Sequence, residues 1–365
     1  MYILAIETSC DDTCAAILQD GPAGVRLLSN LVSSQMIHAE YAGVVPELAS
    51  REHMRLLGPV VREALAAAGL DRAQLSAVAV TNGPGLIGSL LVGLSFAKAL
   101  AYALGIPVVG ISHIEGHLAS LPLDLGEEEV TPPFVGLVAS GGHTEIVAVS
   151  DWGAWTLLGA TRDDAAGEAF DKIAKLLGMG FPGGPQISRA AARGRSDAYD
   201  FPRAWLDLER GGLEMSFSGL KTAVKLFLDR AGWPALPADP EARAGLVADV
   251  AASFQEAVVE VLVAKLLKAA EQSGISRVAL AGGVAANPLL RERLEQAARA
   301  RGVACWLPSP ALCGDNAAMV GMAAIHHLRR GERSGYELAA IPNLDDWSGF
   351  YTVDPGPGAR APLAR

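Results

Sequence analysis

One order of apolar runs, polar turns and glycines occurs twice along the 365 residues, and this internal repeat limits the possible folds more than any other feature. Each copy begins with two apolar runs that flank a polar or glycine-rich turn, and a third run follows. This pattern predicts a β-hairpin with an unusual tip and a further strand in each copy. The runs are Tyr2–Ile6, Cys14–Leu18 and Val25–Leu31 in the first copy, and Phe134–Val138, Ile146–Val149 and Trp155–Ala160 in the second.

The repeat continues into alternating helices and strands. A predicted helix, at His53–Ala68 in the first copy and at Ala252–Ser273 in the second, precedes a strand that ends in a glycine turn. Each turn opens another helix, which ends at a glycine and leads to a last strand. Two copies of this order predict an α/β fold of two duplicated lobes that face a central cleft. The expected division is a first lobe at 1–131, a second at 132–330 with a helical insertion at about 163–244, and a C-terminal segment with a loose tail at 331–365.

Composition narrows the classes of function. Half of the residues are hydrophobic, which suffices for a core, and the net charge of −10 does not suit broad neutralisation of nucleic-acid phosphates. Any RNA contact is therefore expected to be local or shared with a partner. Leu86–Leu104 is the best candidate for a membrane span but contains Lys98, and the N-terminus has no basic leader, so neither a span nor a signal peptide is expected. The four cysteines form no Cys-x-x-Cys pair and are expected to be reduced thiols of a cytoplasmic protein.

Two histidines and an aspartate form a candidate metal site. His113 and His117 are four residues apart, so on a helix they share one face and can reach one ion. They follow a predicted strand, and Asp315 follows the equivalent strand of the second copy, which makes it the expected third ligand. Two imidazoles and a carboxylate suit iron(II), zinc or manganese, and the residue types do not choose among them. Glu115 is not directly after His113, as the zinc-protease pattern requires, and points away from the shared face.

Glycine turns at predicted strand ends are candidate phosphate contacts, because a backbone without a Cβ can approach an anion closely. The two turns at equivalent places are Ser140–Gly142 and Gly282–Gly283, with Asn287 able to bind a nucleoside. At the first hairpin tip, Glu7 and Asp11 are candidates for orienting a substrate or accepting a proton, and ordinary turn residues are the alternative.

Ten short motifs, spread from Met1 to about Met322 in the same order, together resemble the bacterial TsaD family, once mislabelled a glycoprotease. The motifs are Ile6–Asp11, Gly43–Arg51, Gly83–Leu86, His113–His117, Ser140–Thr144, Asp164–Lys172, Pro182–Pro185, Phe217–Thr222, Ala281–Val284 with Asn287, and Asp315–Met319.

The resemblance implies an actin-like/sugar-kinase ATPase fold and a tRNA-modifying transferase. Members of the family transfer the threonylcarbamoyl group from threonylcarbamoyl-AMP to N6 of the adenosine just 3′ of the anticodon, in tRNAs that read codons starting with A. They work with the partner proteins TsaB and TsaE and receive their substrate from TsaC. By the same resemblance, His113, His117 and Asp315 hold an iron ion, with zinc or manganese as alternatives. The residues that would bind the activated adenylate are Val138, Ala139, Ser140, Gly141, Gly142, Asp171, Gly184 and Asn287.

Three positions depart from the family pattern. Gly314 stands where a threonine is usual, Ala139 where a valine is usual, and Val138 where archaeal relatives offer a tyrosine metal ligand. At most three protein side chains are therefore expected on the metal.

The sequence leaves two other functions open. A small-molecule kinase of the same fold would need a carboxylate base at a sugar hydroxyl and magnesium, rather than two histidines. A nucleotide-binding regulatory protein would have lost the chemistry altogether.

For a transferase, the lack of a Ser-His-Asp or Cys-His set favours direct transfer without a covalent intermediate. The metal would then act as Lewis acid and template.

Overall fold

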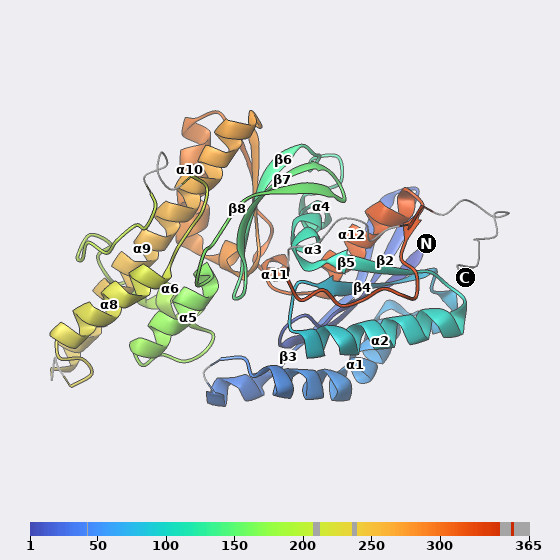
Figure 1. The fold of residues 1–365 in the computed structure, drawn as a ribbon, viewed down its shortest axis with the longest axis horizontal. Coiled ribbons are helices and arrows are strands. Elements are labelled where there is room, and N and C mark those ends of the chain that lie inside the picture. The colour runs from blue at the N-terminus through green and yellow to red at the C-terminus, as the bar shows by residue number, and fades with distance from the viewer. Residues whose placement is uncertain (42, 207–211, 236–238, 344–351, 354–365) are drawn as a thin grey trace. The chain divides into compact units, whose positions relative to one another are not determined.

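Two five-stranded sheets with the same strand order form the framework of the molecule (Figure 1). The computed structural model describes residues 1–41, 43–206, 212–235, 239–343 and 352–353. The first sheet has the order β3-β2-β1-β4-β5 and the second the order β8-β7-β6-β9-β10, so each strand of one copy has an equivalent in the other. The strands are β1 (Tyr2–Glu7), β2 (Asp12–Gly21), β3 (Gly24–Ser34), β4 (Ala77–Gly83), β5 (Val108–Ser112), β6 (Phe134–Ala139), β7 (Thr144–Asp151), β8 (Ala154–Ala160), β9 (Arg277–Ala281) and β10 (Ala304–Trp306), with a short pair β11 (Glu332–Arg333) and β12 (Thr352–Val353) outside both sheets.

The pairing directions are also the same in both sheets. β1 pairs antiparallel with β2 and parallel with β4, just as β6 pairs with β7 and β9. The last strand of each copy is again parallel to its neighbour. The predicted duplicated α/β fold is therefore confirmed. The carboxyl ends of β1, β4 and β5 meet at one edge of the first sheet, and those of β6, β9 and β10 at the equivalent edge of the second, where open α/β sheets bind ligands.

Helices cover the sheets. In the first copy α1 and α2 pack on one face and α12 on the other, and in the second α9 packs against β6, β9 and α10 (Figure 1). The helices are η1 (Met36–Tyr41), α1 (Pro46–Ala68), η2 (Arg72–Gln74), α2 (Ile87–Leu104), α3 (His113–Ala119), α4 (Leu121–Leu125), α5 (Ala166–Leu176), α6 (Gly183–Ala191), α8 (Ser218–Arg230), α9 (Pro240–Ser273), η3 (Gly283–Ala286), α10 (Pro288–Ala300), α11 (Pro310–Cys313) and α12 (Ala317–Arg329).

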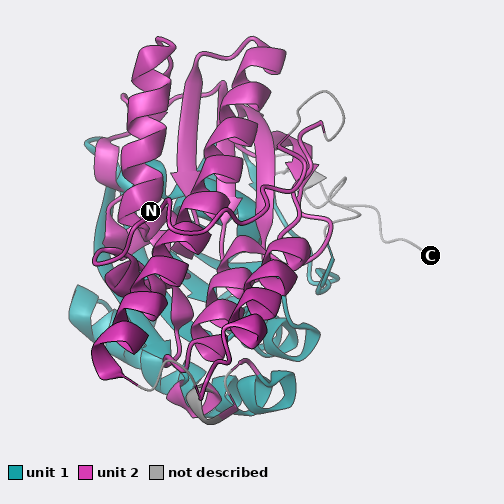
Figure 2. Ribbon diagram, turned by 90° about the vertical axis from the view of Figure 1, so that its left-hand side faces the viewer, with its two compact units in different colours: residues 1–35, 45–123, 316–365 teal, residues 36–44, 124–315 magenta. Residues whose placement is uncertain are grey.

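The chain divides into two compact units (Figure 2). The first contains residues 1–35, 45–123 and 316–365, and the second contains residues 36–44 and 124–315. Residues 316–330 thus group with the first unit, because α12 packs on the sheet of the first copy, although the repeat assigns them to the second lobe. The lobe boundaries expected from the repeat remain predictions.

Alternation along the strands explains how the first sheet is covered on both faces. Successive side chains of a strand point to opposite faces. Leu4 and Ile6 belong to the apolar core that includes residues of α1 and α2, whereas Ala5 lies against Gly321 of α12. A Cβ on Gly321 would also meet the end of the buried Leu18 side chain, so the glycine lets this helix lie close to the sheet.

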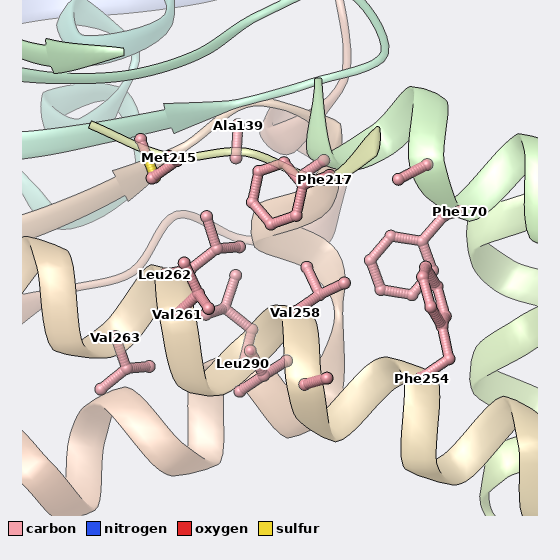
Figure 3. Packing of buried hydrophobic residues seen from close by; sticks show 14 of the residues in the cluster. Ala139, Phe170, Met215, Phe217, Phe254, Val258, Val261, Leu262, Val263 and Leu290 are labelled. Atoms are coloured by element: carbon pink, nitrogen blue, oxygen red, sulfur yellow. The ribbon is translucent and has the colours of Figure 1, made fainter. Parts of the chain in front are cut away.

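The core of the second unit joins its sheet to the helices of the insertion. Phe170 of α5 and Phe254 of α9 are buried with their ring centroids 5.2 Å apart in an edge-to-face arrangement (Figure 3). Phe217, directly before α8, belongs to the same buried cluster as these two rings and Ala139 at the end of β6 (Figure 3). Burial of such aromatic rings contributes about 1.5–3 kcal/mol each, and it holds α5, α8 and α9 in one core with the end of β6.

Two helices begin earlier than the hydrophobic periodicity predicts. α1 begins at Pro46 rather than His53, and α9 at Pro240 rather than Ala252. In α9 the Asp239 side chain accepts a hydrogen bond from the Ala242 N–H and caps the first turn. Proline is tolerated at the first helical position because its missing N–H has no partner there. Hydrophobic periodicity therefore does not predict the first turns of these two helices.

Among the described residues, one helix is long and apolar enough to cross a membrane by length and composition, namely α2. In this structure α2 packs against β4 and α1. The Lys98 ammonium donates to the backbone oxygens of Tyr336 and Leu338. These contacts are those of a helix that covers a sheet.

Candidate functional site

Two buried histidines stand at the end of β5. His113 is the first residue of α3, and His117 follows one turn later. The Ser112 side chain caps this helix by accepting a hydrogen bond from the Glu115 N–H. His113 is 3% exposed and His117 is fully buried, and their ring centroids are 4.6 Å apart. The predicted placement of both imidazoles on one short helix after a strand is therefore confirmed.

Asp315 completes a set of potential metal ligands. One ligand atom from each of His113, His117 and Asp315 lies within 4.8 Å of the other two. Asp315 directly precedes Asn316, whose side chain caps α12 by accepting a hydrogen bond from the Met319 N–H. Because α12 packs against α3, the start of α12 carries Asp315 to the histidines.

The donor set fits a divalent metal ion. Two imidazole nitrogens and one carboxylate oxygen leave further coordination positions open for water or substrate, an arrangement typical of iron(II), zinc or manganese sites. Burial of both imidazoles favours binding, since few water molecules compete for the ligands. The structure thus supports a metal at His113, His117 and Asp315, and the donor types do not select which metal.

Glu7 supports this set from the end of β1. Its Oε2 lies 3.2 Å from His113 Nδ1, and the same carboxylate accepts hydrogen bonds from the Thr81 hydroxyl and the Ser9 N–H. A carboxylate beside the second ring nitrogen orients a metal-binding histidine and leaves the other nitrogen for the ion. Glu7 therefore lies where it can position His113. Asp11, the other candidate at this hairpin tip, accepts a hydrogen bond from the Gln35 N–H through its backbone oxygen.

Glu115 points to α12. Its Oε1 lies 2.8 Å from Nε2 of the buried His327, and Nδ1 of that histidine lies 2.6 Å from Glu332 Oε2. Burial alone would lower the pKa of His327, but the bonds to Glu115 and Glu332 outweigh it and raise the pKa above its usual value, against the opposing charge of Arg330. Glu115 therefore ties α3, which carries His113 and His117, to α12, which begins two residues after Asp315.

The predicted phosphate contacts lie at the matching edge of the second sheet. β6 ends at Ala139 and β9 at Ala281, and the two strands are parallel neighbours with Val138 paired to Ala281. The turns that follow, at Ser140–Gly142 and Gly282–Gly283, are thus side by side. The expectation that they occupy equivalent places of the two copies is wrong, because both follow strands of the second sheet; the counterpart of the turn after β9 is the turn after β4. The Ser140 oxygen accepts a hydrogen bond from the Gly167 N–H, which joins the first turn of α5 to this edge. Val138 and Ala139 are buried at the end of β6.

Glycines near this edge fall into two groups. A Cβ at Gly167 would collide with the Ser140 backbone, and a Cβ at Gly282 with the Ala139 backbone, so those glycines allow the elements to approach. At Gly141, Gly142, Gly184 and Gly283, by contrast, a Cβ would meet nothing within 4 Å. Open space beside backbone N–H groups is what an anion-binding turn requires.

Asp171 and Asn287 hold the surrounding backbone in place. Asp171 Oδ1 accepts a hydrogen bond of 2.6 Å from the Gly183 N–H and so positions the start of α6, where Gly184 lies. Asn287 caps α10 by accepting from the N–H groups of the first turn, and its Nδ2 donates to Gln255 Oε1 at 2.8 Å. Both predicted residues are therefore placed by bonds within the second unit.

The acidic start of the insertion is tied to nearby cations and backbone. Burial alone would raise the pKa of Asp163, but hydrogen bonds from the Ser216 hydroxyl and from two N–H groups at the start of α8 outweigh it and hold the pKa below its usual range. Asp164 binds Lys221 at 2.6 Å and Lys172 at 2.9 Å, and these two lysines lower its pKa despite burial. Lys221 is therefore held beside a carboxylate.

Sequence reasoning missed two residues that shape these two edges. Thr81 of β4 donates a hydrogen bond to the predicted residue Glu7 of β1, and Gly167 allows the start of α5 to approach the Ser140 backbone. The signal for Thr81 is the strand order, since β1, β4 and β5 are neighbours and end together. No signal in the sequence pairs Gly167 with Ser140, because that contact depends on how α5 packs.

The chain is similar to the proteins of one family over most of its length. The sequence model of that family, described as TsaD: tRNA N6-adenosine threonylcarbamoyltransferase, matches residues 26–322. A protein named tRNA N6-adenosine threonylcarbamoyltransferase from Syntrophobacter fumaroxidans is 51% identical over 352 residues, which cover 96% of this chain and 100% of the relative. A protein of the same name from Clostridium perfringens is 48% identical over 343 residues, which cover 94% of this chain and 97% of the relative.

A solved structure of full-length HypF in its phosphate- and nucleotide-bound form is similar in fold. The match covers 90% of this chain and 47% of that one, with a TM-score of 0.57 and 14% identity. At that identity the likeness concerns the fold alone.

Proposed function

Because the chain belongs to the TsaD family of tRNA N6-adenosine threonylcarbamoyltransferases, and is therefore a transferase that acts on tRNA, we propose that it transfers the threonylcarbamoyl group from threonylcarbamoyl-AMP to N6 of the adenosine just 3′ of the anticodon. The tRNAs concerned read codons that start with A. The observation that carries this proposal over a sugar kinase of the same fold is the His113, His117 and Asp315 set, which such a kinase does not need.

The chemistry proceeds by direct transfer. The adenosine N6 attacks the carbonyl carbon of threonylcarbamoyl-AMP, a mixed anhydride, and the bond from that carbon to the phosphate oxygen breaks. AMP leaves with the electron pair, and N6 releases its proton to water. AMP is already a good leaving group, so the reaction depends more on holding the charged phosphate than on a strong base. The backbone N–H groups of the Ser140–Gly142 turn are suited to that task, because the space beside them is open.

His113, His117 and Asp315 would hold a metal ion, which is iron by family resemblance. When bound, the ion would act as a Lewis acid and template. Glu7 would keep His113 in the orientation that binds the ion, through its contact with Nδ1. The adenylate would lie against Val138–Gly142, Gly184 and Asn287, with Asp171 fixing the start of α6 beneath it.

The proposal includes the family's partners. TsaB and TsaE would work with this chain, TsaC would supply the threonylcarbamoyl-AMP, and the reaction would take place in the cytoplasm, where the tRNA is.

Nucleoside mass spectrometry tests the reaction. Unmodified tRNA is incubated with the protein, threonylcarbamoyl-AMP and purified TsaB and TsaE, and then digested to nucleosides. We expect the threonylcarbamoylated adenosine to accumulate, and to be absent when the tRNA carries another base 3′ of the anticodon. Unchanged adenosine in the complete mixture would refute the proposed function.

A second experiment separates direct from covalent transfer. The protein is incubated with radiolabelled threonylcarbamoyl-AMP without tRNA, denatured and examined for label on the polypeptide. We expect none. A stoichiometric adduct that tRNA discharges would replace direct transfer by a two-step mechanism.

A further inference from the structure

A cationic pocket opens in the second unit beside α5 and α8, in a chain whose net charge is −10. The cavity has a volume of about 700 Å³ and is lined by side chains from α5, α8, the segment after α8 and the start of α9. Five of the lining residues are cations, and Asp229 is the only carboxylate among them. The cations are Lys172, Lys175, Lys221, Lys225 and Arg243.

Two of these lysines are fixed in place by one carboxylate. Asp164 Oδ1 binds Lys172 and Asp164 Oδ2 binds Lys221, at 2.9 and 2.6 Å. Lys172 also binds Glu168 at 2.8 Å. Burial alone would lower the pKa of Lys172, but its bonds to Glu168 and Asp164 outweigh it and raise the pKa, so the ammonium stays charged. The carboxylates therefore hold cations at the wall of the pocket.

Two further cations have no carboxylate partner among the described residues. Lys175 is exposed on α5, one turn after Lys172. The Arg243 guanidinium lies over the Trp233 ring, 4.4 Å from its centroid, and donates a hydrogen bond of 2.7 Å to the Pro234 oxygen. A guanidinium stacked on an indole is a rigid, flat cation that is already oriented for a planar or anionic group.

We propose that this pocket binds phosphodiester groups of the tRNA backbone. This inference rests on the proposed function, which makes tRNA the substrate. An acidic protein can bind RNA only where cations are concentrated, because its overall charge repels phosphates. Lysine and arginine are the side chains with which proteins most often neutralise nucleic-acid phosphates. Because phosphate contacts carry no sequence information, the pocket would position tRNA without selecting among anticodons.

Removal of the two cations that lack a carboxylate partner in the described part of the chain, Lys175 and Arg243, tests the site. The double variant Lys175→Gln/Arg243→Gln is compared with the wild-type chain for binding of unmodified tRNA, by filter binding at several salt concentrations. Each lost phosphate contact lowers the salt slope by about 0.7–1. We therefore expect the slope to fall by about 1.4–2 and the Kd at 0.15 M salt to rise roughly 10- to 50-fold. Lys268→Gln/Arg301→Gln removes the same charges outside the pocket, from α9 and from the residue that follows α10, and serves as the matched control.

Two further measurements keep the result interpretable. The melting temperature reports whether loss of the Arg243 stack unfolds the region, and Lys175→Glu, at an exposed position, reverses one charge without touching that stack. Calorimetric binding of AMP should be the same in all variants. Unchanged tRNA affinity in both pocket variants, or an equal loss in the control, would overturn the proposal. A wild-type chain that binds tRNA through the pocket but leaves it unmodified would support the pocket and refute the proposed function.

Discussion

Gly282 and Gly141 lie at the same edge of the second sheet, and we expect alanine at the first to lower stability and alanine at the second to weaken ligand binding. Gly282 has φ +87° and ψ 163°, a region that only glycine adopts readily, and its Cβ would collide with the Ala139 backbone. Such strain costs about 1–3 kcal/mol, and the collision adds to it, so Gly282→Ala should cost about 3 kcal/mol. In a unit of about 200 residues this corresponds to a fall of roughly 6–12 °C in Tm.

Gly141→Ala should behave in the opposite way. A Cβ at Gly141 meets nothing within 4 Å, and its φ lies outside the left-handed region. The new methyl group should therefore leave stability unchanged or raise it by about 0.4–1 kcal/mol, through the unfolded chain. If a phosphoryl oxygen lies against this N–H, the methyl group displaces it. A lost hydrogen bond to a charged group costs about 1.5–3 kcal/mol, which weakens binding roughly 10- to 150-fold.

Thermal unfolding and calorimetric titration with AMP measure the two effects on the same samples. Gly219→Ala on α8, where a Cβ also meets nothing, is the matched control and should change neither quantity by much. If Gly141→Ala binds AMP as tightly as the wild-type chain, the Ser140–Gly142 turn is not a phosphate contact. If it loses as much Tm as Gly282→Ala, that glycine is structural and the reasoning from open space is wrong.

Three further predictions concern titratable and metal-binding groups. Elemental analysis of the folded double variant His113→Ala/His117→Ala should find no bound metal, and full retention of metal would sink the assignment. Because folding raises the pKa of His327, its contribution is complete below the unfolded pKa of about 6.5 and is lost as the pH rises through the folded value. The stability advantage of the wild-type chain over His327→Gln in urea unfolding should therefore shrink between pH 6 and pH 9, and an advantage that grows would contradict the network. Burial raises the pKa of Cys305 to about 12 and that of Cys313 to about 11, so iodoacetamide at pH 7.5 should label both thiols only after denaturation, as read by peptide mass spectrometry.

The repeat in the sequence predicted the architecture because both copies use the same signals at the same places. Apolar runs that stop at polar or glycine turns predict the hairpins and the parallel strands, and the order of the strands in both sheets confirms them. The start of α9 was predicted twelve residues too late, at Ala252, since apolar periodicity was the criterion. The local signal was present, because Asp239 followed by Pro240 is typical of a helix start.

The sequence predicts only those parts of the candidate site that depend on patterns local to one helix or one strand end. The spacing of His113 and His117 depends on one helix, and Asp315 followed from the equivalence of two strand ends. The contact of Glu7 with His113 depends on three neighbouring strands ending together, and the contact of Glu115 with His327 depends on how α12 crosses α3. Packing of elements far apart in the sequence decides such contacts, and residue spacing carries no record of it.

The duplication also explains why a ligand is expected at only one of the two equivalent glycine turns. At the end of β4, the first copy fills the space with its own chain: the Ile341 N–H donates to the Asn82 oxygen at 2.7 Å, and a Cβ on Gly83 would collide with the Ile341 backbone. A Cβ on Gly85 would lie 2.6 Å from the Ser9 oxygen. At the end of β9 no such contact exists for Gly283, whose Cβ would meet nothing within 4 Å. Since the two edges share one backbone topology, the difference lies in what covers them. The first copy thus has its glycine turn covered and carries the two histidines at its next strand end, whereas the second copy leaves space beside Gly283, which is why we expect the anion there.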